Sequence, residues 1–382
     1  MRKRKICIIT GTRAEYGLFF PIIKKIQFSD YLELQIVATT MHFSEEFGNT
    51  YKQIEEDGFI IDEKIENLLS SDTKSSIAKS TGLATILLSD AFSRLAPDVV
   101  LVLGDRFETH AAATTAMLMN IPIAHIHGGE ITEGAMDEKI RHSITKMSSL
   151  HFTSTDEYRN RVIQMGEPLS TVFSVGAPGI DNIVSMNLLS KSELESKLEW
   201  KFNGITALFT FHSETLSTVD TRKEIKRILK IIGDSNIGIL FTYANSDDGG
   251  RVINSEIEEF SSKDKDKYLV VKNLGQLKYL SAMKHLDFVI GNTSSGIIEA
   301  ASFQKPVINI GNRQKGRLQS ANVINSTIEK LEDSIFQAMS ASFIEHCNNV
   351  VNIYGDGSAS HLIVTSLEGQ NLSPIKKFHN LL

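Results

Sequence analysis

Short, continuously apolar runs alternate with amphipathic helical segments along this chain, and this alternation restricts its fold more than any other feature. In the first half the runs include KICIIT (5–10), LQIVAT (34–39), DVVLVL (98–103) and LHFTS (150–154). Strands that are covered on both faces lack the apolar–polar alternation of half-solvated strands. The sequence therefore predicts parallel strands that are connected and covered by helices.

The same pattern restarts after the loop GAPGIDN (176–182), with runs such as ITALFTF (205–211), IGILFTY (237–243) and PVINIG (306–311). A chain of 382 residues is also too long for one ordinary core. We expect two Rossmann-like, doubly wound α/β domains that face each other across a ligand cleft. Their expected bounds are 1–178 and 179–360, and 361–382 is expected to be a C-terminal helix or tail that can pack back on the N-terminal domain.

Composition narrows the functional classes. The formal net charge is −6, with 41% hydrophobic and 23% charged residues. Such a chain has no general attraction for nucleic acid or for an anionic membrane, and we expect neither as a partner. No apolar run is long enough for a membrane span or a signal peptide. The two cysteines form no disulfide or ligand pattern, so we expect a cytoplasmic protein.

Two strand ends of the first domain carry arginines. GTRAEYG (11–17) follows the first strand, where Arg13 can contact a phosphate near a helix N-terminus. GDR (104–106) follows another strand, where Arg106 can bind a phosphate and Asp105 can accept a proton. A solvated turn and a salt-bridged corner are the structural alternatives.

The segment 125–142 packs three histidines and four carboxylates into eighteen residues. His125 and His127 are expected on one face of a strand end, and Asp137 and Arg141 lie one helical turn apart, so that their side chains meet. Zinc ligation would require further ligands within reach. We favour acid/base chemistry without a metal, and we expect Arg141 to contact the substrate.

The second domain has a comparable segment at 291–317. Thr293 and Ser294 open a helix, where hydroxyls and free backbone N–H groups suit a diphosphate. Glu299 lies further along that helix and can accept hydrogen bonds from ribose hydroxyls, and Arg313 follows the next strand. A simple helix cap is the alternative, but two consecutive loops of this kind favour a nucleotide or sugar-nucleotide site.

In this order and spacing, these motifs resemble the UDP-N-acetylglucosamine 2-epimerase family, and more closely its hydrolysing branch from sialic-acid-type biosynthesis. The resemblance covers nearly the whole chain. Its most specific segments are GTRAEYG (11–17), GNTYKQIEEDG (48–58), GDRFE (104–108), HIHGGE with DEKIRH (125–142), and GNTSSGIIEA with PVINIGNRQ (291–314). It implies the glycosyltransferase-B arrangement, with UDP held mainly by the second domain and the sugar facing the first.

The resemblance also implies roles for individual residues. In the first domain, the implied nucleotide-binding residues are Arg13 and Arg106. In the second domain, the implied UDP contacts are His212, Asn245, Thr293, Ser294, Glu299 and Arg313. Catalytic or sugar-contacting positions are His42, Asp105 and Asp137.

One position departs from the pattern of many relatives, which carry His-x-Glu with a catalytic glutamate. Here the corresponding residue is His127, and Glu130 follows three residues later. Either His127 takes the acid/base role, which an imidazole can fill near neutral pH, or Glu130 does. The departure also suits a modified sugar, such as UDP-2,4-diacetamido-2,4,6-trideoxy-glucose, which is used for legionaminic acid.

The resemblance implies that UDP leaves C1 while C2 loses a proton, and that water then adds to the resulting glycal. From UDP-N-acetylglucosamine the products are free N-acetylmannosamine and UDP. Arg13, Arg106 and Arg313 would stabilise the leaving diphosphate. Asp137 and His127 are the first candidates for proton transfer, with Asp105 and Glu130 in support. No metal or other cofactor is required.

Several alternatives remain open at this point. They are the same reaction on the diacetamido sugar, a GDP-linked substrate, a non-hydrolysing epimerase, a glycosyltransferase of the same architecture, and a non-catalytic nucleotide-sugar sensor. The resemblance further implies a homo-oligomer, either a dimer or a tetramer.

Overall fold

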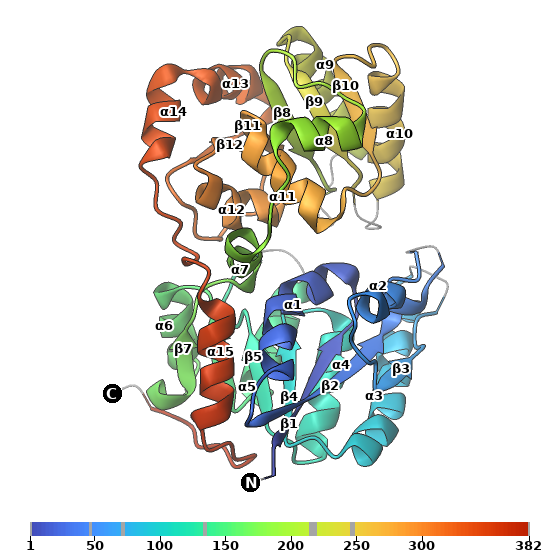
Figure 1. Ribbon diagram of the computed structural model, residues 1–382, viewed down its shortest axis with the longest axis vertical. Coiled ribbons are helices and arrows are strands. Elements are labelled where there is room, and N and C mark those ends of the chain that lie inside the picture. The colour runs from blue at the N-terminus through green and yellow to red at the C-terminus, as the bar shows by residue number, and fades with distance from the viewer. Residues whose placement is uncertain are drawn as a thin grey trace. The chain divides into compact units, whose positions relative to one another are not determined.

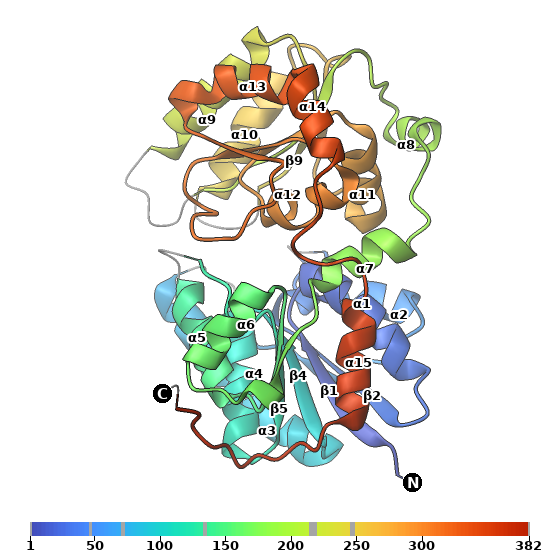
Figure 2. The ribbon, with the colours of Figure 1, turned by 90° about the vertical axis from the view of Figure 1, so that its left-hand side faces the viewer.

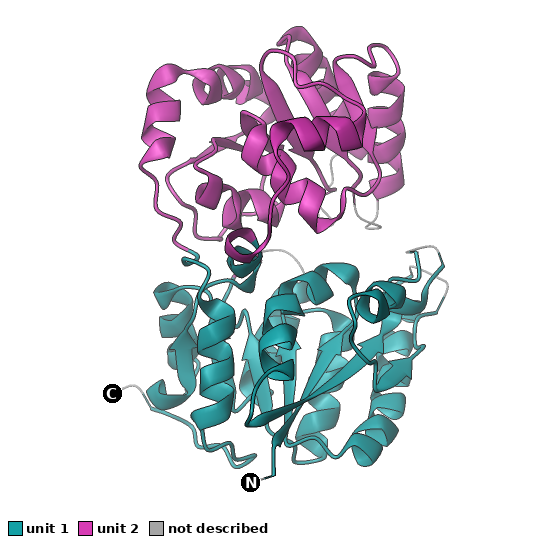
Figure 3. Cartoon of the chain, in the orientation of Figure 1, with its two compact units in different colours: residues 1–130, 136–182, 354–382 teal, residues 131–135, 183–353 magenta. Residues whose placement is uncertain are grey.

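The computed structural model describes residues 2–45, 48–69, 73–132, 136–213, 220–244 and 249–380. The chain divides into two compact units, which Figure 3 draws in different colours. Unit 1 contains Met1–Glu130, Met136–Asn182 and Tyr354–Leu382, and unit 2 contains Ile131–Ala135 and Ile183–Ile353. The chain therefore returns to unit 1 at its C-terminal end.

Unit 1 is built around a seven-stranded parallel sheet with the order β3-β2-β1-β4-β5-β6-β7 (Figure 1). Its strands are β1 (Arg4–Thr10), β2 (Leu32–Thr39), β3 (Glu63–Ile65), β4 (Val99–Leu103), β5 (Ile123–Ile126), β6 (Leu150–Thr153) and β7 (Val172–Ser174). Its helices are α1 (Arg13–Gln27), α2 (Tyr51–Glu56), α3 (Lys74–Leu95), α4 (Phe107–Leu118), α5 (Met136–Met147), α6 (Asp156–Gln164) and α15 (Ala359–Gly369), with 3₁₀ turns η1 (Thr40–Phe43) and η2 (Leu169–Thr171). The strand order reverses at β1, and doubly wound sheets bind ligands outside the carboxyl ends of their strands at such a point.

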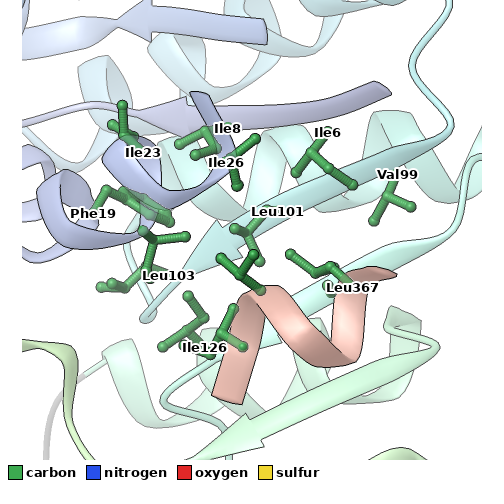
Figure 4. Packing of buried hydrophobic residues seen from close by; sticks show 14 of the residues in the cluster. Ile6, Ile8, Phe19, Ile23, Ile26, Val99, Leu101, Leu103, Ile126 and Leu367 are labelled. Carbon is green, nitrogen blue, oxygen red and sulfur yellow. The ribbon is translucent and has the colours of Figure 1, made fainter. Parts of the chain in front are cut away.

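Helices cover both faces of this sheet because successive side chains of a strand point to opposite faces. On β1, Ile6 and Ile8 belong to one buried cluster and Cys7 belongs to another. The first cluster includes Phe19 of α1 and Leu367 of α15 (Figure 4). The second cluster packs against α3 and α4. Both faces of the strands are therefore apolar, as the uninterrupted runs in the sequence predict.

Unit 2 has a six-stranded parallel sheet with the order β10-β9-β8-β11-β12-β13. Its strands are β8 (Thr206–Thr210), β9 (Gly238–Thr242), β10 (Tyr268–Val271), β11 (Phe288–Gly291), β12 (Val307–Ile310) and β13 (Val323–Ser326). Its helices are α8 (Lys191–Leu198), α9 (Thr221–Asp234), α10 (Gly250–Ser261), α11 (Gly275–His285), α12 (Ser294–Ile298), α13 (Leu331–Met339) and α14 (Ala341–Asn348), with 3₁₀ turns η3 (Ala300–Phe303) and η4 (Ile328–Lys330). Helices α9, α10 and α13 pack on one face of the sheet, and α8 and α11 pack on the other (Figure 2).

Two parallel-sheet α/β units confirm the expected fold class. The short strands β3 and β13 were not predicted, since β3 has one apolar residue and β13 has two, too few to form an apolar run. Strand β5 ends at Ile126, so His125 lies in the strand and His127 follows it. Within the described ranges, no helix has both the length and the apolar character needed to cross a membrane.

Helix α15 is joined to α7 (Pro178–Ser185) by a buried carboxylate. Asp181 is 3% exposed and accepts hydrogen bonds from the backbone N–H groups of Ala359 (3.1 Å) and Ser360 (2.7 Å), and from the Ser360 hydroxyl. The first N–H groups of a helix have no partner inside the helix, so Asp181 caps α15 from a distant part of the chain.

We expect Asp181→Ala to lower the free energy of unfolding by about 1–3 kcal/mol, because it removes this cap and leaves buried N–H groups without an acceptor. Hydrogen exchange of the α15 amides should accelerate with it. Asp181→Asn keeps one acceptor oxygen and should be less destabilised. Unchanged protection of α15 in Asp181→Ala would contradict the capping role.

Candidate active site

Polar and ionisable side chains gather at the carboxyl ends of the central strands in each sheet. In unit 1 they follow β1, β2, β4 and β5, and in unit 2 they follow β8, β11 and β12. This is the edge at which doubly wound sheets bind their ligands.

A buried arginine joins the segments that follow β4 and β5. Arg141, on α5, is 2% exposed, and its guanidinium forms an ion pair with Asp105. It also donates a 2.8 Å hydrogen bond to the backbone carbonyl of Glu130 and lies 3.6 Å from the Glu138 carboxylate. Removing one partner of such a buried pair typically costs about 3–5 kcal/mol, because the other charge is left uncompensated. Arg141 therefore holds Asp105 and the loop after β5 in fixed positions.

His127 and Glu130 form a hydrogen-bonded pair in the loop after β5. His127 has a φ of 68°, a left-handed conformation that is uncommon for a residue with a side chain. Its Nδ1 lies 2.6 Å from Oε1 of Glu130, which also accepts a 2.9 Å hydrogen bond from the Ser154 hydroxyl. Because the carboxylate is the acceptor, Nδ1 is the donor in this contact, and in the neutral tautomer Nε2 holds a lone pair. No described residue hydrogen-bonds Nε2, so this atom can take a proton from a ligand.

His125 has a structural role instead. It is fully buried, its Nε2 donates to the carbonyl of Gly104 at 2.8 Å, and its Nδ1 lies 3.3 Å from the Thr145 hydroxyl. Burial lowers the pKa of His125 to about 3, so the ring stays neutral. Across the described ranges there is no group of three or more His, Cys, Asp or Glu side chains that could hold a metal ion.

Arg106 lies among carboxylates at the start of α4. Its Nε pairs with Glu108, which is 1% exposed. Burial opposes the charge of Arg106, but Glu108, Glu15 and Asp137 together raise its pKa. Burial and the charge of Glu108 in turn raise the pKa of Glu15 to about 7. A Cβ at position 11 would lie 2.5 Å from the Glu108 carboxylate, so a larger residue than Gly11 would displace Glu108. Asp137, half-buried in the first turn of α5, thus shares the electrostatic environment of Arg106.

The other two first-domain candidates differ in their surroundings. The Arg13 side chain, at the start of α1, is half-buried and forms no ion pair or hydrogen bond with a described residue. It is therefore available to an anion. His42 is buried, with Nε2 3.0 Å from the Thr10 hydroxyl and Nδ1 2.8 Å from the Thr50 hydroxyl. Burial lowers the pKa of His42 to about 4, so it is a neutral ring held between two hydroxyls.

In unit 2, Asn292 connects three loops. Its Oδ1 accepts from the backbone N–H of His212 (2.7 Å), and its Nδ2 donates to the carbonyl of His212 (2.8 Å). Its own carbonyl accepts from Arg313 (3.0 Å) and Gln314 (2.9 Å). Burial and the nearby charge of Arg313 lower the pKa of His212 to about 3. The site therefore presents a neutral imidazole beside a guanidinium.

Hydroxyl groups surround a carboxyl at α12. Glu299 accepts a hydrogen bond from Ser295, and burial raises its pKa to about 7. The Thr293 hydroxyl caps the helix by accepting from the N–H of Ser295 at 3.4 Å. The hydroxyl of Tyr279 is buried close to Thr293 and Ser295, but it has no well-oriented hydrogen bond to a described residue. The Ser294 side chain is half-buried and likewise makes no hydrogen bond with a described residue. These groups can contact sugar or phosphate oxygens.

Comparison with known proteins identifies the family. Residues 24–368 match the family described as UDP-N-acetylglucosamine 2-epimerase. The chain is 46% identical over 344 residues to a GDP/UDP-N,N'-diacetylbacillosamine 2-epimerase (hydrolyzing) of Campylobacter jejuni, covering 90% of this chain and 89% of that protein. The chain belongs to the UDP-N-acetylglucosamine 2-epimerase family. It is also 35% identical over 357 residues to a UDP-N,N'-diacetylbacillosamine 2-epimerase (hydrolyzing) of Legionella pneumophila, covering 94% and 93% of the two chains.

The fold of this epimerase-family protein is also shared with solved structures. A UDP-GlcNAc 2-epimerase from Neisseria meningitidis, solved bound to UDP-GlcNAc, superposes with a TM-score of 0.80. Its sequence identity is 20%, and the match covers 95% of this chain and 99% of that one. The fold is therefore the one that the sequence resemblance implies.

Most residues that the sequence analysis assigned to the site of this family member lie in pairs. Asp105 contacts Arg141 and His127 contacts Glu130. The charge of Asp137 raises the pKa of Arg106, and the charge of Arg313 lowers the pKa of His212. Asn245 lies outside the described residues.

Four further site residues were not predicted: Glu15, Ser154, Tyr279 and Asn292. Thr12 and Glu15 form a capping box, which the Thr-x-x-Glu spacing indicates. Asn292 stands inside the quoted GNTSSG motif. No local sequence pattern indicates Ser154 or Tyr279, because each lies close to site residues that are distant from it in the sequence.

The neutral, buried His125 makes folding depend on pH. Histidine in an unfolded chain titrates near 6.5, whereas His125 stays neutral down to about pH 3. Between these values the unfolded state binds the additional proton, so stability is present above pH 6.5 and is lost as the pH falls. At pH 5 this group costs about 2 kcal/mol relative to neutral pH. We expect His125→Gln to reduce the pH dependence of unfolding between pH 5 and 7 by about that amount, measured by hydrogen exchange of the β4 and β5 amides. Equal pH dependence in both proteins would contradict this.

Proposed function

We propose that this chain is a hydrolysing 2-epimerase whose substrate is a nucleotide-linked 2,4-diacetamido-2,4,6-trideoxy-glucose, the sugar also called N,N'-diacetylbacillosamine. The names and identities of the Campylobacter and Legionella relatives support this sugar. The sequence analysis put UDP-N-acetylglucosamine first and this sugar second, and the relatives favour the second. UDP is the expected nucleotide. GDP stays an alternative, because the name of the Campylobacter relative includes both nucleotides.

The observation that carries the proposed mechanism is the pair of His127 and Glu130. Nδ1 of His127 is bound to the Glu130 carboxylate at 2.6 Å, so Nε2 is the atom that can accept the C2 proton. The carboxylate also favours the imidazolium that forms when the proton arrives. Ser154 holds the same carboxylate oxygen at 2.9 Å. In this scheme His127 is the base and Glu130 orients it.

Asp137 is the candidate for the second proton transfer, to the opposite face of C2. It is half-buried at the start of α5, and its charge acts on Arg106. Asp105, which an ion pair with Arg141 holds in place, would assist the proton transfer. His42 is a fully buried neutral ring between two hydroxyls, and it would hold the segment after β2 in place rather than carry a proton.

The leaving nucleotide needs positive charge and hydrogen-bond donors. We assign the diphosphate to Arg13, Arg106 and Arg313, since preorganised cations stabilise charge that develops as the bond from C1 breaks. His212, Asn245, Thr293, Ser294 and Glu299 are the proposed contacts to the rest of the nucleotide. Loss of the nucleotide and of the C2 proton gives a glycal. Water then adds OH to C1 while C2 regains a proton, which yields the free 2-epimer.

UDP-N-acetylglucosamine remains the second candidate substrate. The name of the family and the neighbouring structure with bound UDP-GlcNAc support it, and its products would be N-acetylmannosamine and UDP. A non-hydrolysing epimerase would return a nucleotide-linked product. A sensor would bind nucleotide sugar without turnover.

Substrate and reaction type can be tested together by NMR in D₂O. We expect the purified protein to convert the UDP-linked diacetamido sugar, or its GDP-linked form, faster than UDP-N-acetylglucosamine. The product should be a free 2-epimer with deuterium at C2, together with free nucleotide. Faster turnover of UDP-N-acetylglucosamine would reverse the substrate assignment. Nucleotide-linked product would establish the non-hydrolysing reaction, and binding without turnover would establish a sensor.

The role of His127 is tested by His127→Asn, because asparagine tolerates the left-handed backbone but cannot act as the base. We expect kcat to fall by about 10²–10⁴-fold, the usual contribution of a general base, while nucleotide binding measured by calorimetry persists. Substitution of an exposed histidine, His346→Asn, controls for the change of residue type. A fall of less than about threefold in His127→Asn would move the base to Asp137.

A further inference from the structure

The C-terminal segment 371–380 contacts the end of α5, the helix that carries two site residues. The ammonium of Lys376 donates hydrogen bonds to the backbone carbonyls of Thr145 (3.2 Å), Lys146 (2.8 Å) and Ser148 (2.6 Å). The last carbonyls of a helix have no partner inside the helix, and a cation there also interacts favourably with the helix dipole. Lys376 therefore caps α5 from a part of the chain that lies 228 to 231 residues away in the sequence.

The same lysine completes the pairing of a buried carboxylate. Glu167 has a fully buried side chain, and it pairs with Lys376 at 2.7 Å, with Lys146 at 2.6 Å and with His151 at 3.1 Å. Burial alone would raise its pKa, but these three donors lower it to about 2. Loss of Lys376 would therefore leave a buried negative charge with weaker compensation.

Two further contacts hold the tail in place beside Lys376. The ring of Phe378 lies 4.9 Å from the Lys146 ammonium and packs against Gly166, where a Cβ would come within 2.5 Å of it. The backbone N–H of His379 donates to the carbonyl of Gly166 at 2.9 Å. The tail is thus bound through several side chains and through its backbone.

The contacts of Lys376 are connected to the candidate site through residues of α5 and β6. Thr145 offers its carbonyl to Lys376 and its hydroxyl to His125. One turn earlier on α5, Arg141 holds Asp105. In β6, His151 pairs with Glu167 and lies opposite His125 in the register of the sheet. A change at Lys376 would therefore reach groups that hold the site, although Lys376 is not among the site residues.

We propose that Lys376 is a positioning residue of this enzyme: by capping α5 and pairing with Glu167, it fixes the helix that sets Arg141 and Asp137 in place. Small displacements of catalytic groups lower the rate much more than they lower binding. The inference rests on the proposed function, since its main readout is turnover of the substrate.

The test compares Lys376→Met with Lys376→Arg and with the adjacent, exposed Lys377→Met. We expect Lys376→Met to lower kcat by about tenfold with KM changed less than about twofold, because the catalytic groups lose their alignment. Lys376→Arg restores a cation and should recover most of the loss, while Lys377→Met should match the wild type. Amides of α5 should exchange faster in Lys376→Met only. If Lys376→Met does not fold, Lys376→Gln, which keeps an uncharged N–H donor group, takes its place.

The outcomes separate this inference from the proposed function. A folded Lys376→Met with wild-type kcat would overturn the positioning role, and so would a loss that Lys376→Arg does not recover. If the wild type turns over neither sugar nucleotide, the proposed function fails. The hydrogen-exchange rates of the α5 amides then test whether Lys376 fixes α5. Unchanged rates in Lys376→Met would refute that role.

Discussion

The arrangement of the candidate-site residues in unit 1 depends on one buried guanidinium. Arg141 is 2% exposed, and it joins three segments by pairing with Asp105 and by bonding to the carbonyl of Glu130. A buried cation is tolerated only where acceptors surround it, so the loop after β4 and the loop after β5 must both be in place. The carbonyl that Arg141 binds belongs to the residue that orients His127. The helix that carries Arg141 also carries Asp137, and so the two proposed proton-transfer groups depend on the same contact.

Burial divides the ionisable groups of the site into two kinds. It lowers the pKa values of His42, His125 and His212 to between about 3 and 4, so these rings stay neutral and act as hydrogen-bonding groups. It raises the pKa values of Glu15 and Glu299 to about 7. These histidines therefore carry no charge near neutral pH, whereas Arg106 and Arg141 stay charged beside carboxylates.

The sequence predicted the elements that depend on local pattern. Uninterrupted apolar runs predicted the parallel strands, and the polar residues that follow them marked the strand ends. Beyond the expectation that the C-terminal segment can pack back on the first domain, it did not predict which residues of distant segments make contact. Three contacts illustrate this: Glu130 accepts from Ser154, Asn292 hydrogen-bonds the backbone of His212, and Lys376 caps α5. The residues that they join lie between 24 and 231 positions apart. Such contacts follow from the packing of the whole unit, which no local spacing encodes. The HIH run illustrates the same limit, because its two histidines have different partners once the strand ends between them.

The departure from the His-x-Glu pattern has a physical interpretation in these contacts. Where the resemblance implies a carboxylate, this chain has His127, and Glu130 supplies a carboxylate that is bound to Nδ1 of the ring. In the proposed mechanism, the exchange replaces an oxygen base with a nitrogen base that a carboxylate orients. An imidazole gains and loses its proton readily near neutral pH, whereas a carboxylate does so only when its surroundings raise its pKa. The left-handed backbone at His127 and the following Gly128 and Gly129 let the chain turn back within three residues, so that Glu130 can reach Nδ1. The substitution and the turn after it therefore form one arrangement, and neither residue would serve the proposed reaction without the other.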